Sequence, residues 1–205
     1  MTVLDFEDRL RAAQKGDGDA FAAIWRQFQP GLLRYLKVKA APVAEDLAAD
    51  VWTRVVRALP AFKGDEQSFK AWLYTTARNR LTDWYRSNQR LMEGVEISRF
   101  ADMAADYHVE QEAADRLATD AALALIGQLP PAQAEAVMLR VIAGLDVARV
   151  ARVMGRSPGA VRVLCHRGLR LLEGRLQEGD QGIEQAPACL ADVASAPVPS
   201  TLESA

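Results

Sequence analysis

Cysteine and histidine are scarce in this 205-residue chain, with two of each. Cys165, Cys189, His108 and His166 show none of the spacings of a zinc site, so we expect no metal. The sequence also lacks a phosphate-binding glycine loop and the clustered His, Cys and carboxylate residues that catalysis uses. We therefore expect a protein that is not an enzyme and needs no cofactor.

Long apolar runs are missing as well. No stretch approaches the roughly 18 apolar residues of a membrane span. The acidic start, with Asp5, Glu7 and Asp8, lacks the basic and apolar regions of a secretory signal. We therefore expect a cytoplasmic protein with no membrane insertion, in which a structural disulfide is not expected.

Helical periodicity is what the chain does have. Between residues 44 and 90, two amphipathic patterns flank a polar loop that runs from Pro60 to Ser68. Their apolar stripes are Leu47, Val51, Val55 and Leu59 in the first, and Phe69, Trp72, Leu73, Ala77, Leu81 and Trp84 in the second. Two shorter patterns precede them, and together they predict a bundle of about four helices up to residue 91. We expect Asp19 and Ser68 to be N-caps, and Pro30 to kink or break its helix.

The second half carries a helix-turn-helix pattern. Thr119 is an expected N-cap, and Pro131 suits the first turn of the helix that follows it. Further on, Gly155 suits a left-handed helix end, Ser157 an N-cap and Pro158 a first helical position. On the last helix we expect the following residues to pack inward: Val161, Leu164, Cys165, Gly168, Leu169 and Leu172.

These patterns predict an all-α protein of two small helical domains joined by a flexible linker. We assign residues 1–91 to an N-terminal helical bundle, 92–118 to the linker, 119–176 to the helix-turn-helix domain and 177–205 to a disordered tail. The net charge of −2 hides a segregated pattern. Residues 70–90 hold five Lys or Arg against one Asp, and residues 149–176 hold seven Arg against one Glu. A nearly neutral total therefore does not argue against nucleic-acid binding, since contacts depend on local clusters of charge.

Both informative stretches resemble one known family. AEDLAADVWTRVVRALPAF and FKAWLYTTARNRLTDWYRSNQR resemble the polymerase-binding and promoter-melting helices of region 2 in the extracytoplasmic-function (ECF) sigma factors of the sigma-70 family. LPPAQAEAVMLRVIAGLDVARVARVMGRSPGAVRVLCHRGLRLL resembles their region 4. The resemblance implies a subunit that directs RNA polymerase core to promoters and assists promoter melting.

The resemblance also assigns roles to faces. It implies core polymerase binding, at the clamp helices of the largest subunit, by Asp46, Asp50, Thr53, Arg54 and Arg57. It implies minus-10 DNA binding by Phe62, Lys63, Gly64, Asp65, Arg78, Asn79, Arg80, Arg86 and Arg90. Minus-35 DNA binding falls to Arg156, Ser157, Gly159, Arg162, His166 and Arg167. Further partners implied by the family are the flap of the second-largest subunit, through region 4, and an anti-sigma factor.

A stand-alone helix-turn-helix regulator with an N-terminal sensor or dimerisation domain is the alternative. It explains residues 145–176 equally well, but it gives no reason for a basic face and a polar loop in the N-terminal bundle.

Overall fold

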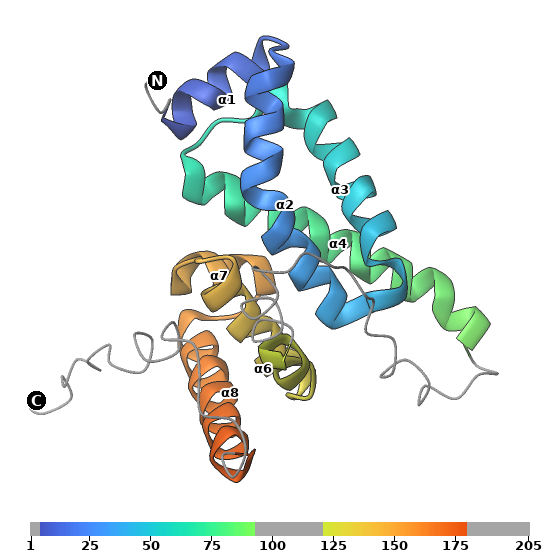
Figure 1. Ribbon diagram of the computed structural model, residues 1–205, viewed down its shortest axis with the longest axis vertical. Coiled ribbons are helices and arrows are strands. Elements are labelled where there is room, and N and C mark those ends of the chain that lie inside the picture. Colours follow the sequence, from blue (N-terminus) through green and yellow to red (C-terminus); the bar gives the residue numbers. More distant parts are fainter. Residues whose placement is uncertain (1–4, 93–120, 180–205) are drawn as a thin grey trace, which may run out of the picture.

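The computed structural model describes residues 5–92 and 121–179, and every regular element within them is helical. This confirms the expected all-α class. Figure 1 shows two groups of helices, one from each half of the chain. The N-terminal group contains α1 (Phe6–Gln14), α2 (Gly18–Ala40), α3 (Ala44–Ala58) and α4 (Glu66–Met92). The C-terminal group contains a helical segment over residues 121–127, α6 (Pro131–Val137), α7 (Val147–Met154) and α8 (Pro158–Gly179).

Three short turns complete the described elements. Two are 3-10 turns, η1 (Ala41–Val43) and η2 (Leu59–Ala61), on either side of α3. The third, η4 (Met138–Ile142), is a π-helical turn that continues α6. Nearly all of the predicted linker, the predicted cap Thr119 and most of the predicted tail lie outside the described residues, although α8 extends to Gly179.

The N-terminal bundle is centred on aromatic packing around Phe69 of α4. Its fully buried ring lies 5.5 Å from the ring of Phe6 and 5.2 Å from that of Phe28, measured between centroids. Phe62 and Trp72 contact it from the other side. Because these rings belong to α1, α2, the loop after η2 and α4, one residue ties together most of the bundle.

The predicted stripe of α3 is confirmed, and the stripe of α4 is confirmed in part. All four residues of the first stripe are buried, three in α3 and Leu59 at the start of η2, as are Phe69, Leu73, Ala77 and Leu81 of α4. Trp72 and Trp84, expected in the core, are only partly buried and pack against its edge. The core also includes Tyr74, which the stripe omitted.

Helix starts differ from the expectation in two places, and of the kink or break expected at Pro30 the break is absent. Asp17 caps α2 instead of Asp19, because its carboxylate accepts hydrogen bonds from the backbone N–H groups of Asp19 and Ala20 at 2.9 and 3.0 Å. Asp65 takes the place of Ser68 at the start of α4, accepting from the Ser68 N–H at 2.8 Å. Pro30 does not break α2, which continues as one helix past it.

The helix-turn-helix forms as predicted. Gly155 ends α7 with φ 64° and ψ 39°, the left-handed conformation that favours glycine. The Ser157 hydroxyl accepts from the Ala160 N–H at 3.2 Å, and Pro158 is the first residue of α8. On α8, Val161, Gly168 and Leu172 are buried and the other three predicted inward residues are half-buried. The short turn therefore fixes α8 relative to α7.

The two groups of helices pack against each other. Helix α7 lies against α4, and η4 lies against α2. Among the described residues, no helix combines the length and the apolar character needed to cross a membrane.

Phe69→Ala should lower the free energy of unfolding by about 3–5 kcal/mol, because it removes a large buried ring and leaves a cavity among four other rings. Urea denaturation followed by far-UV circular dichroism measures the change. Val56→Ala, at an exposed position on α3, is the control and should shift stability by less than about 0.5 kcal/mol. Equal losses in the two variants would contradict a central role for Phe69.

Candidate nucleic-acid interface

The polar face of α3 is open to solvent. All five residues predicted there are exposed: Asp46, Asp50, Thr53, Arg54 and Arg57. Asp50 also forms an ion pair with Arg80 of α4. Arg80 is itself flanked by Asp83 at 3.6 Å, so it lies in an acidic groove between α3 and α4 that Asp46 also lines. The predicted protein-binding face and one predicted DNA-binding side chain are therefore in direct contact.

An aromatic pair supports the loop before α4. The Phe62 ring stacks on the Trp72 ring, with centroids 5.0 Å apart and planes inclined by 22°. The Gln14 side chain of α1 fixes the backbone beneath the loop, donating to the carbonyl oxygens of Leu59 and Phe62 at 3.0 and 2.7 Å. Both rings are partly exposed, so apolar surface lies beside the polar groups of the loop.

Glycine is required at position 64. Its φ is 155°, and a Cβ there would lie 2.8 Å from the Cβ of Ser68 and 3.1 Å from the ring of Phe62. The loop turns back so closely on the first turn of α4 that no side chain fits between them.

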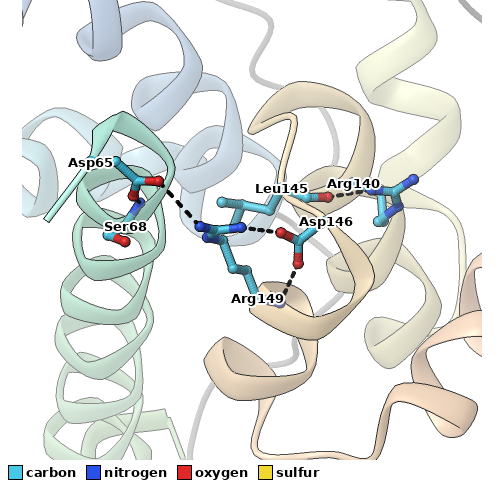
Figure 2. A network of polar contacts seen from close by, with 6 residues as sticks. All are labelled: Asp65, Ser68, Arg140, Leu145, Asp146 and Arg149. Atoms are coloured by element: carbon cyan, nitrogen blue, oxygen red, sulfur yellow. Dashed lines mark hydrogen bonds and ion pairs between the residues drawn. The ribbon is translucent and has the colours of Figure 1, made fainter. Parts of the chain in front are cut away.

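Asp65 links this loop to the other group of helices. Hydrogen bonds from the side chain and backbone of Ser68 lower the pKa of Asp65, and the nearby Arg149 guanidinium adds to the effect. Arg149, on α7, lies 3.5 Å from the Asp65 carboxylate and also pairs with Asp146 at the start of its own helix (Figure 2). The Asp65 carboxylate therefore has a basic side chain of α7 beside it, although it stays largely exposed.

The side chains of α4 that were predicted to bind the minus-10 element point in different directions. Asn79 and Arg86 are seven residues apart and exposed, so they share one face of the helix. Arg80 points toward α3, as described above. Arg78 is half-buried and donates from Nε to the Glu135 carboxylate of α6 at 3.0 Å. The side chain of Arg90 lies outside the described residues.

Tyr85 lies at the edge of the same helix and is exposed. Its hydroxyl donates to the backbone carbonyl of Lys39, so it connects α4 to the end of α2. Burial raises the pKa of Tyr85, which keeps this donor protonated.

The helix-turn-helix presents its predicted residues to solvent. Arg156 and Ser157 in the turn, and Gly159 at the start of α8, are exposed. Arg162, His166 and Arg167 are exposed on the outward side of α8, together with the apolar Val163. An exposed basic helix with small residues at its N-terminal end has the form of a major-groove reader.

Sequence reasoning missed the residues that join the two groups. Glu135 contacts Tyr35, Lys39 and Arg78, and Arg149 contacts Asp65. The pairs of Glu135 are separated by up to 100 residues, and no local pattern marks partners at such separations.

Comparison with known proteins gives two family matches. The model named Sigma-70 region 2 matches residues 24–91, and the model named Sigma-70, region 4 matches residues 119–172. They occur in that order, with the predicted linker between them.

Individual relatives agree with the family models. The chain is 31% identical to the ECF RNA polymerase sigma factor ShbA of Streptomyces griseus, over 82% of this chain and 94% of ShbA. It is 33% identical to the ECF RNA polymerase sigma factor BldN of Streptomyces coelicolor, over 80% of this chain but only 62% of BldN. The structure of CnrH in complex with the cytosolic domain of CnrY aligns with a TM-score of 0.58 and 22% identity, over 83% of this chain and 96% of that one, which is a likeness of fold.

Gly64→Ala should lower the free energy of unfolding by about 1–3 kcal/mol, because alanine is strained at this φ and its methyl group collides with Ser68. Thermal unfolding measured by circular dichroism tests this. Gly18→Ala is the matched control, since a Cβ at Gly18 meets no atom within 4 Å and φ is not positive there. A Gly64 variant as stable as the control would show that the loop relaxes freely.

Proposed function

The chain belongs to the ECF RNA polymerase sigma factors of the sigma-70 family, and from this membership we propose how its surfaces share the work of initiation. As a sigma factor it directs RNA polymerase core to promoter DNA. We assign residues 1–91 to region 2, 92–118 to the linker and 119–176 to region 4.

One observation carries the choice of function. The N-terminal bundle matches region 2 in its own right, and a stand-alone regulator with a sensor domain would match region 4 alone. The polar loop and the exposed basic side chains of the bundle then have a purpose, because they belong to a DNA-binding domain.

We assign core polymerase binding to the exposed face of α3, with the clamp helices of the largest subunit as its partner. The exposure of all five predicted residues supports this assignment. Region 4 is assigned a second contact, with the flap of the second-largest subunit. Two separate contacts raise the effective concentration of the second binding event once the first has formed.

The loop and α4 are assigned to the minus-10 element. An extruded base needs a flat surface to stack on and polar groups for its edge. The stacked Phe62 and Trp72 rings supply the surface, and the loop carries Lys63 and Asp65 beside them. Asn79 and Arg86 lie on one exposed face, where they are placed for a base edge and a phosphate. Strand opening in this scheme uses binding energy and needs no covalent catalysis.

We assign the minus-35 element to α8. Arg162 is the main candidate for base reading, because an arginine can donate two hydrogen bonds to one guanine. Arg156, His166 and Arg167 are assigned to supporting contacts, with Ser157 and Gly159 permitting close approach.

We extend the proposal to a cytoplasmic location and an anti-sigma partner, which follow from the family. The CnrH structure is a complex with the cytosolic domain of CnrY, and its fold is similar to that of this chain.

Asn79→Ala should impair open-complex formation by about tenfold or more while core binding is retained, because the lost amide serves the extruded base and not the polymerase. Run-off transcription and permanganate footprinting with purified core measure opening, and co-elution with core measures binding. Thr53→Ala, on the assigned polymerase face, is the comparison. It should weaken co-elution with core more than the Asn79 variant does. If wild-type protein does not co-elute with core at micromolar concentration, the assigned function is wrong. Equal loss of binding and opening in the Asn79 variant would make that residue structural.

Arg162→Ala should change the preferred upstream sequence, with a loss of about 1–3 kcal/mol of discrimination at one base pair. Run-off transcription on a library with a randomised upstream box measures the preference. Arg170→Ala, further along the exposed side of α8, controls for lost positive charge and should weaken binding without changing the preference. An unchanged preference in the Arg162 variant would remove its assigned role.

A further inference from the structure

One carboxylate of region 4 is held by three side chains of region 2. The Oε1 atom of Glu135, on α6, accepts from the Tyr35 hydroxyl at 3.1 Å and from Arg78 Nε at 3.0 Å. Its Oε2 atom lies 3.8 Å from the ammonium group of Lys39. The side chain of Glu135 is only 12% exposed, and that of Lys39 only 16%.

This contact differs from an ordinary surface ion pair. A carboxylate removed from water is stable only where charged or hydrogen-bonding partners replace the water, and here it has two cations and a hydroxyl. Burial lowers the pKa of Lys39, an effect that Glu135 opposes. Burial and Glu135 both raise the pKa of Tyr35, so its hydroxyl stays protonated and able to donate. With region 4 packed against region 2, the Glu135 carboxylate thus has a hydroxyl donor and two cations as partners.

The second contact between the regions is weaker. The Asp65 side chain, which pairs with Arg149, is 54% exposed, and exposed pairs contribute little. It nevertheless involves a residue of the predicted minus-10 loop. The regions also meet where α7 lies against α4 and where η4 lies against α2, with Ile142 close to Gly31. Glu135 is thus the principal polar connection between the two regions among the described residues.

Glu135 binds Arg78, a side chain that the proposed function assigns to DNA. A carboxylate and a phosphate present similar oxygens to a guanidinium, so the Nε–H of Arg78 that donates to Glu135 is not available to a phosphate while this contact lasts. We propose that Glu135 is an internal substitute for a DNA phosphate, which closes region 4 onto region 2 and withholds Arg78 from the minus-10 strand until the two regions separate. This rests on the proposed function, in which Arg78 contacts that strand.

Separation of the regions is compatible with the chain that connects them. In the sequence, 28 residues, 93–120, separate α4 from the helical segment that begins at residue 121. Fully extended, such a length spans on the order of 90 Å, so the connection does not oblige the two regions to stay in contact.

The test measures closure and DNA binding separately in the full chain. Dyes are placed at Lys15→Cys and Gln177→Cys, exposed positions at the ends of α1 and α8, after both native cysteines are replaced by alanine. Energy transfer between the dyes reports closure, and fluorescence anisotropy of a short, mixed-sequence single-stranded oligonucleotide reports binding. Glu135→Gln should lower the transfer efficiency and strengthen binding by about tenfold, since the neutral amide no longer balances Lys39 and Arg78.

Two further variants control the experiment. Tyr35→Phe keeps the buried ring but removes one donor, so it should change both readouts in the same direction and by less. Glu173→Gln removes a carboxylate from an exposed position of α8 and should leave the transfer efficiency unchanged.

The outcomes separate the proposal from the function beneath it. Unchanged transfer efficiency in both the Glu135 and Tyr35 variants overturns the proposal that Glu135 closes region 4 onto region 2, whatever happens to DNA binding. Lower transfer with no gain in binding overturns the withholding of Arg78. In that case Arg78→Ala is added to the Glu135→Gln chain. Weaker binding on this addition would keep the assigned role of Arg78, and unchanged binding would show that this role is also wrong.

Discussion

Aromatic packing around Phe69 is the constraint on which region 2 depends. The ring joins α1 and α2 to α4, and its contact with Phe62 fixes the loop that precedes α4. The conformation of the loop is consequently fixed, and the Phe62 and Trp72 rings are stacked without any ligand. A surface built before binding loses less conformational entropy when a base is captured. In the proposed function, stability and strand recognition therefore share the same side chains.

Much of the fold follows from local patterns. The stripe of α3, the proline and glycine signals of the helix-turn-helix and the exposed face of α8 all appear in the structure as expected. Each of these depends on residues within one or two helical turns, where spacing and capping chemistry decide the conformation. The errors at Asp17 and Asp65 have one cause. In both places two nearby polar residues could cap the helix, Asp17 or Asp19 in α2 and Asp65 or Ser68 in α4. The earlier residue of each pair accepts the backbone hydrogen bond.

The contacts between the two regions could not be predicted in this way. Arg78 and Arg80 look equivalent in the sequence, yet one faces Glu135 of α6 and the other Asp50 of α3. The partly buried Trp72 has a similar explanation. The apolar stripe of α4 placed it in the core, but its ring stacks on Phe62 of the preceding loop. Long-range pairing sets the environment of each side chain, and periodicity on one helix carries no information about it.

The short turn at Gly155 has a consequence for the order of events on DNA. It fixes α8 relative to α7, and α7 is the helix that lies against α4, so closure leaves the outward side of α8 exposed. Access to the two promoter boxes is therefore unequal in the closed molecule. In the proposed function, duplex DNA can reach α8 in the closed molecule, whereas Arg78 becomes available to the minus-10 strand only after the regions part. On the proposed function, upstream-box recognition and strand capture become successive stages, separated by an internal rearrangement of the protein.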